Sequence, residues 1–162
     1  MNCEAAQTGQ TRFENACQRK QDLENGYIWK PQLYVGGTFR SRRGGLHENE
    51  VVEKIRSWSD RLASYSKSHI IVDAVWEYKD NNWHFHGTVL AETKIKCQLA
   101  KSLWKEGIGD FRVYDENQGG VIYNHLGHND TYLVNRVACH RRSGACRRNK
   151  CPYQHGSASV HI

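Results

Sequence analysis

Apolar residues recur at helical spacing between about Asn49 and Ser66, and this pattern predicts the longest element of the chain. Residues 33–39, Leu-Tyr-Val-Gly-Gly-Thr-Phe, are predicted to form a strand before it, and the basic, glycine-containing loop 40–45 joins the two elements. The apolar face of the helix is expected to consist of Val51, Val52, Ile55, Trp58, Leu62 and Tyr65.

Two apolar runs separated by a short polar segment predict a β-hairpin between residues 69 and 92. Asp80 and Asn81 suit its two-residue turn. With that turn, Glu77 lies directly across from His84. Because side chains alternate along a strand, His84 and His86 project from the same sheet face as Glu77. The opposite face would carry four aromatic residues that pack against the helices: Trp76, Tyr78, Trp83 and Phe85.

The rest of the pattern predicts shorter elements. A second amphipathic helix is expected over about residues 94–107, followed by strands at 111–114 and 121–123. A short helix is expected to begin at Tyr132, capped by residue 130 or 131. The order strand, helix, hairpin, helix, strand, helix predicts an α+β sandwich with the helices on one face of an antiparallel sheet.

Charge is concentrated at one end of the chain. The 162 residues, enough for one sizeable core, include 23 Lys and Arg against 17 Asp and Glu, a net charge of +6. All six excess cations follow Thr131, where there is no acidic residue. No apolar run approaches the roughly 18 residues that cross a bilayer, and residues 1–20 lack the apolar centre of a secretory signal. We therefore expect an intracellular protein that is neither secreted nor embedded in a membrane.

Two imidazoles and a carboxylate on one sheet face suit a divalent metal with open positions for a substrate. Glu77, His84 and His86 are the predicted ligands, and Mn²⁺ or Mg²⁺ the predicted ion. A solvent-facing strand with two incidental histidines is the simpler interpretation. The same ligand types also form the iron site of oxygenases, but those sites usually lie in barrels of many short strands, and this chain has too few.

Residues 76–87, Trp-Glu-Tyr-Lys-Asp-Asn-Asn-Trp-His-Phe-His-Gly, resemble motif 2 of the HUH endonucleases, in which two histidines flank a bulky apolar residue. The Glu seven positions before the first His is similar to the arrangement in parvovirus-type Rep nickases. Residues 33–39 lie where the family has its first-strand motif, and Leu-Trp-Lys-Glu-Gly at 103–107 resembles a turn common in Rep proteins.

The resemblance spans roughly residues 33–138. It implies a ferredoxin-like HUH fold that nicks single-stranded DNA and becomes covalently attached to it through a 5′-phosphotyrosine. Such enzymes initiate the replication of viruses or mobile elements, and a viral source would be compatible with a location in the host nucleus.

HUH enzymes use a tyrosine on a helix near the metal, often followed by a basic residue one turn later. Tyr132-Leu-Val-Asn-Arg136 resembles the Tyr-x-x-x-Lys form, and helical spacing would bring Arg136 to the face of Tyr132, where it could meet a phosphate. Tyr123 is followed by His128, but Gly127 weakens a helix there. We favour Tyr132 as the nucleophile and keep Tyr123 as the alternative. Either could instead be a core tyrosine, and both motifs lack the family's lysine.

A cysteine cluster near the end of the chain predicts a structural zinc site. Cys139, Cys146, Cys151 and His155 follow the spacing Cys-x6-Cys-x4-Cys-x3-His, a sufficient tetrahedral set for Zn²⁺, with His140 as a substitute ligand. Free cysteines in an unstructured tail are the simpler interpretation. Nine residues are predicted to bind nucleic acid through charge or stacking: Arg40, Arg42, Arg43, Arg141, Arg142, Arg147, Arg148, Lys150 and Tyr153.

The predicted organisation has four segments: a polar N-terminal extension (1–30), an HUH-type nuclease domain (31–138), a Cys3His zinc-binding segment (139–155) and a flexible tail (156–162). The main functional alternative is a non-catalytic protein that binds single-stranded nucleic acid, RNA included, and holds zinc for structure. A third hypothesis is a structural or host-interaction protein whose zinc serves only folding.

Overall fold

The computed structural model describes residues 29–40 and 43–117, four positions before them (Glu14, Cys17, Gln18 and Gln21), and the backbone of two later strands at 132–138 and 159–161. Most of the predicted N-terminal extension, the predicted strand at 121–123 and the whole Cys3His segment lie outside these residues. In the described part, no helix is long and apolar enough to span a membrane.

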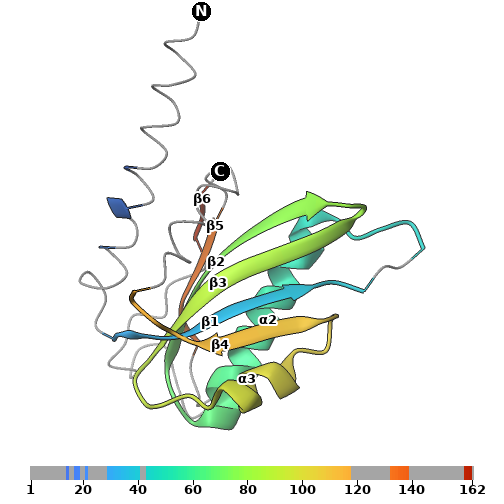
Figure 1. Cartoon of the computed structure of the whole chain (residues 1–162). Coiled ribbons are helices and arrows are strands. Elements are labelled where there is room, and N and C mark those ends of the chain that lie inside the picture. Colours follow the sequence, from blue (N-terminus) through green and yellow to red (C-terminus); the bar gives the residue numbers. More distant parts are fainter. Residues whose placement is uncertain are drawn as a thin grey trace, which may run out of the picture.

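An antiparallel sheet with two helices packed on one face forms the domain (Figure 1), which confirms the predicted α+β class. The strands lie in the order β4-β1-β3-β2-β5-β6, and each neighbouring pair is antiparallel. The elements are β1 (Pro31–Thr38), α2 (Glu48–Ser66), β2 (Ile70–Lys79), β3 (Asn82–Ala91), α3 (Cys97–Leu103), β4 (Gly109–Val113), β5 (Tyr132–Ala138) and β6 (Ser159–His161).

Helix α2 begins and ends with local signals that the sequence supplies. The Glu50 carboxylate accepts a hydrogen bond of 2.8 Å from the backbone N–H of His47, which satisfies a donor that would otherwise lack a partner at the helix start. The helix ends where Lys67 adopts a left-handed conformation with φ of 52°. Of the six apolar residues predicted to face the core, five are buried, whereas Tyr65 is 68% exposed.

The core lies between the helices and one sheet face, and aromatic rings occupy its centre. Trp58 of α2 is fully buried and contacts Phe85 of β3, Phe111 of β4 and Trp104, with ring centroids 5.6–6.1 Å apart. Its indole N–H donates to the Ala100 carbonyl at 3.1 Å, so burial leaves no unpaired donor on this ring. A smaller apolar cluster lies on the other sheet face around Ile71 and Leu90, with Trp29, Tyr34 and Tyr114 packed against it.

The segment between α3 and β4 docks against the end of β1. The backbone N–H of Thr38 donates to the Ile108 carbonyl at 2.9 Å, and the N–H of Ile108 donates to the Thr38 hydroxyl at 3.0 Å. Gly107 lies so close to Thr38 that a Cβ atom would overlap the Thr38 carbonyl group. Close packing therefore explains the glycine of the Leu-Trp-Lys-Glu-Gly segment, and burial of Trp104 in the aromatic core explains its tryptophan.

The hairpin has the predicted turn and register. Asp80 and Asn81 have φ values of 52° and 60°, the positive values that a two-residue type I′ turn requires. Glu77 pairs with His84 across the ladder, as predicted. Trp76 and Phe85 are buried in the core, and Trp83 packs at its edge. Tyr78 differs from the prediction, because it lies at the hairpin end beyond the helices and is 59% exposed.

Three other predictions differ from the structure. The predicted helix at Tyr132 is wrong, because Tyr132–Ala138 forms strand β5 along the edge of β2. Helix α3 is shorter than the expected 94–107 and covers only Cys97–Leu103. The tail predicted for residues 156–162 contains Ser159–His161, which pairs with β5 as β6.

Replacing Gly107 with Ala should lower the free energy of unfolding by roughly 1–3 kcal/mol, the usual cost of overpacking a tight contact. The added methyl group must push the loop away from the Thr38 carbonyl and strain the two hydrogen bonds that join these segments. Urea unfolding monitored by circular dichroism measures the change. Lys105→Ala, at an exposed position in the same loop, is the control. Equal midpoints for the two variants would contradict this role of Gly107.

Candidate metal and nucleic-acid site

Three of the predicted metal ligands lie on the sheet face opposite the helices. Glu77 of β2 and His84 of β3 are directly paired, and His86 follows two residues later on the same strand face. All three side chains are half-buried. The type I′ turn fixes this juxtaposition, since any other register of the hairpin would separate the carboxylate from the imidazole.

The two imidazoles turn toward different neighbours. The His84 ring Nε2 lies 3.2 Å from the Lys79 carbonyl oxygen, so it carries the proton and donates toward the hairpin turn. His86 extends over β1, where its Nδ1 would lie 3.2 Å from a Cβ at Gly36. Gly36 pairs with both His86 and Asp110, and its missing side chain leaves room for the His86 ring over β1.

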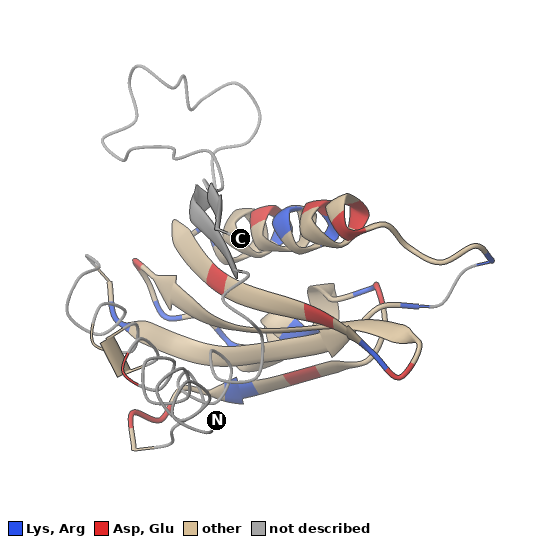
Figure 2. Ribbon diagram, turned by 90° about the horizontal axis from the view of Figure 1, so that it is seen from above, with Lys and Arg blue, Asp and Glu red and all other residues tan. Residues whose placement is uncertain are grey.

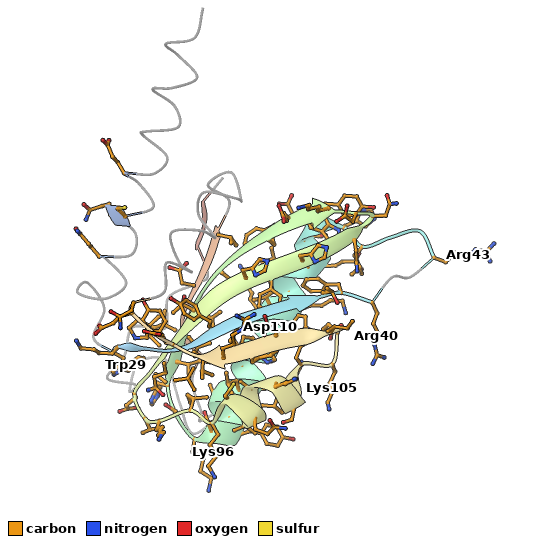
Figure 3. The ribbon with its side chains drawn as sticks, in the orientation of Figure 1. Trp29, Arg40, Arg43, Lys96, Lys105 and Asp110 are labelled. Atoms are coloured by element: carbon orange, nitrogen blue, oxygen red, sulfur yellow. The ribbon has the colours of Figure 1, made fainter. Side chains whose placement is uncertain are left out.

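Asp110 of β4 adds a second carboxylate to this face, and the sequence analysis missed it. A hydrogen bond from Arg112 holds the pKa of Asp110 below its usual value, and the charges of Arg112, His86 and Lys101 act in the same direction, against partial burial, which raises it. Figure 3 labels Asp110 on β4, the edge strand that lies beside β1. The alternation of Asp110 and Arg112 was visible in the sequence, but their position beside His86 depends on the β1–β4 register.

Glu77, His84 and His86 are of the residue types that bind divalent cations. Among the described residues, no three His, Cys, Asp or Glu side chains are already gathered around one point. Glu77 and His84 are cross-strand partners, and His86 lies about 7 Å further along the strand. Both imidazoles would have to turn, His84 away from the Lys79 carbonyl and His86 away from β1, before the three side chains could face one ion. Two nitrogen atoms and one or two carboxylates suit Mn²⁺ and leave coordination positions for a substrate.

The backbone of β5 brings Tyr132 into the same cross-strand row as His86. Val75 of β2 pairs with His86 on one side and with Tyr132 on the other. Two strand spacings separate the backbones of Tyr132 and His86, which is roughly 10 Å. On a strand, Arg136 lies about 13 Å along the chain from Tyr132, so the helical pairing predicted for these two residues is absent.

The predicted nucleic-acid-binding residues are only partly described. Arg40 and Arg43 are exposed on the loop between β1 and α2, at the opposite end of the domain from Lys96 (Figure 3). Figure 2 shows basic positions in this loop, a basic and an acidic position next to each other at the hairpin end, and charges of both signs along α2. The other predicted site residues lie outside the described part: Tyr123, Arg42, Cys139, Arg141, Arg142, Cys146, Arg147, Arg148, Lys150, Cys151, Tyr153 and His155.

Comparison with protein-family models, with curated proteins and with solved structures found no match to this chain.

Replacing Arg112 with Gln should raise the pKa of Asp110 toward its ordinary value, because the charged hydrogen bond that favours the carboxylate is removed. A carboxyl group whose pKa is lower in the folded protein than in the unfolded chain stabilises the folded protein at pH values above its ordinary pKa. This stabilisation is lost as the pH falls through the lowered pKa. NMR titration of the Asp110 carboxyl carbon measures the shift. Arg56→Gln, which removes a cation paired with Glu53 on α2, should leave Asp110 unchanged. An unchanged pKa of Asp110 in Arg112→Gln would contradict the role of Arg112 as the main cause of the lowered pKa.

Proposed function

We propose that this chain is a metal-dependent HUH-type endonuclease that nicks single-stranded DNA and attaches itself to the 5′ end. The observation that carries the proposal is the alignment of Glu77, His84 and His86 on the sheet face away from the helices. The fold supports it, because β1, α2, β2, β3, α3 and β4 follow the βαββαβ order of ferredoxin-like domains. The replication of a virus or mobile element is the process in which such an activity serves.

A divalent cation held by Glu77, His84 and His86 would supply positive charge to the oxygen atoms of the scissile phosphate. The tyrosine hydroxyl loses its proton to water and attacks the phosphorus atom. The bond from phosphorus to the 3′ oxygen breaks, and that oxygen takes up a proton from solvent. The products are a tyrosine joined to the 5′ phosphate and a free 3′ hydroxyl, so atoms and charge balance.

Tyr132 is the first candidate for the nucleophile because of its position in the sheet. The helical Tyr-x-x-x-Arg arrangement is replaced by a strand position, two strands from His86. The remaining separation of roughly 10 Å between backbones is one that two long side chains and a phosphate can span. Tyr123 is the second candidate and is decided by the same experiment.

The Cys3His segment is proposed to hold a structural Zn²⁺ beside the strand that carries Tyr132. Cys139 directly follows the end of β5, so a metal-bound fold would fix that end of the strand. The arginines between the ligands would then contact the phosphates of the bound strand.

A non-catalytic protein that binds single-stranded nucleic acid is the second candidate function. It is favoured by the absence of a lysine from both tyrosine motifs and by the separate orientations of the His84 and His86 rings. The same residues would then contact phosphate without cutting.

Incubation with a pool of single-stranded DNA oligonucleotides and Mn²⁺ should give a covalent adduct, visible on a denaturing gel. Tyr132→Phe should abolish it, because no other group on that side chain can attack phosphorus. His84→Ala and Glu77→Gln should slow it by a hundredfold or more, about the loss expected when charge stabilisation of the transition state is removed.

Tyr65→Phe is the matched control, since Tyr65 is exposed on α2 on the other side of the sheet. An adduct that survives in Tyr132→Phe but disappears in Tyr123→Phe would move the nucleophile. No adduct with any oligonucleotide, together with tight, salt-sensitive binding, would overturn the enzyme and support the second candidate.

Purified protein should retain about one zinc ion per chain after dialysis, and Cys146→Ser should lose it. Replacing Arg141, Arg142, Arg147 and Arg148 together with Gln should remove most of the salt dependence of DNA affinity, measured by fluorescence anisotropy over a salt series. Substitution is preferable to truncation, because Ser159–His161 pairs with β5. Zinc-free protein, or an unchanged salt slope, would contradict the corresponding part of the proposal.

A further inference from the structure

A pocket lies at the end of the hairpin, on the sheet face opposite to the Glu77–His84 pair. A hollow of about 220 Å³ separates the hairpin turn from the loop between β1 and α2. It is lined by Arg40, Gly45, Leu46, Tyr78, Asn81, Asn82 and Trp83, which we call the hairpin pocket.

The aromatic side of the hairpin pocket is built on a fixed ring and an exposed one. The indole N–H of Trp83 donates to the Leu46 carbonyl at 2.9 Å, which holds that ring against the loop. Tyr78 pairs with Trp83 across the ladder and packs edge-on against it, with ring centroids 5.3 Å apart. Although Tyr78 is 59% exposed, its backbone position is set by the ladder, so an incoming flat group meets a ring whose position is already restricted.

The polar side of the pocket offers amide groups from the turn. Asn81 has a positive φ, which the type I′ turn imposes, and its side chain is exposed. The Asn82 side-chain oxygen accepts a hydrogen bond of 2.9 Å from the backbone N–H of Trp83, so the orientation of this amide is set. Asparagine amides offer both a donor and an acceptor, as the edges of nucleobases do.

Arg40 gives the pocket a positive charge. Arg40 lines it, and in the part of the chain that the structure describes its guanidinium makes no ion pair, in contrast to Lys54, Arg56 and Arg112. The backbone N–H of Arg40 bonds to the Glu106 carbonyl, which brings the exposed Lys105 to the same end of the domain (Figure 3). Asp80 in the turn is the nearest acidic residue along the hairpin, and the carboxylate of Glu106 is paired with Lys54.

We propose that the hairpin pocket binds one unpaired nucleotide of a single-stranded DNA, with the base stacked on Tyr78 and the phosphate beside Arg40. The volume lies below the roughly 300 Å³ at which pockets for whole small molecules begin, so it fits one ring system of a longer ligand. An exposed aromatic ring next to an arginine is the usual arrangement for binding single strands without reading their sequence. The proposal takes its ligand class from the proposed function but needs neither the metal nor the nucleophile.

Binding in EDTA tests the pocket separately from nicking. The probe is a fluorescein-labelled oligodeoxythymidine about twelve nucleotides long, within the range that one such domain covers, and the readout is anisotropy. Tyr78→Ala should weaken binding by about five- to a hundredfold, whereas Tyr78→Phe should retain most of it. Arg40→Ala should weaken binding and lower its salt dependence by about one phosphate contact.

Matched controls come from the same chain. Tyr65→Ala removes a tyrosine that is 68% exposed on α2, and Lys96→Ala removes an exposed cation at the far end of the domain (Figure 3). Neither should change the affinity appreciably. Circular dichroism should give the wild-type spectrum for Tyr78→Ala, since the ring is mostly exposed.

Each result separates the pocket from the proposed nuclease. Wild-type affinity in Tyr78→Ala, with an adduct still formed in Mn²⁺, would overturn the pocket and leave the nuclease intact. A loss in Tyr78→Ala without any adduct would support the pocket and overturn the nuclease. Tighter binding of the matching oligouridine than of the DNA would overturn DNA as the occupant, and no binding of either strand would overturn both proposals.

Discussion

The register of the β2–β3 hairpin is the constraint on which the rest of the structure depends. Its two-residue turn requires positive φ at both Asp80 and Asn81, and both residues adopt it. Since side chains alternate along a strand, a slip by one residue would bring Phe85 to the outer face and His84 into the core. The apolar core and the candidate metal site therefore select the same register, one through burial and the other through chemistry.

Burial enforces that register from the helix side. Phe85 is fully buried and lies against Trp58 and Trp104, so a slipped hairpin would lose the centre of the aromatic core and place a polar ring there. Glycines allow the neighbouring segments to come close enough. Gly107 lets the loop before β4 dock on β1, and Gly36 leaves space over β1 for His86. Small residues next to large rings thus determine which polar groups meet on the outer face.

The sequence predicted the elements whose signals are local. The helix at Glu48–Ser66 follows from its apolar period, and the turn at Asp80 and Asn81 fixed every pair in the hairpin, including Glu77 with His84. Contacts between segments far apart in the sequence were harder to predict from it. Asp110 shares a cross-strand row with His86 only through the registers of β1 with its two neighbours, and Tyr132 forms a strand because the edge of β2 is available for pairing, which overrides a local capping signal. The exposure of Tyr78 depends on where the covering helices end, which the alternation of the strand does not specify.

The two faces of the hairpin end explain how one short segment can serve two kinds of contact. Glu77 and His84 face outward as a cross-strand pair, and the next pair, Tyr78 and Trp83, faces the other way and borders the pocket with Arg40. Consecutive residues on each strand are only about 3.8 Å apart, so a flexible strand held at one face can reach the other by passing around the turn. A base on Tyr78 would then limit the path of the chain that reaches His84. Positioning of this kind raises the effective concentration of a phosphate near the ligands without adding a group to the chemistry.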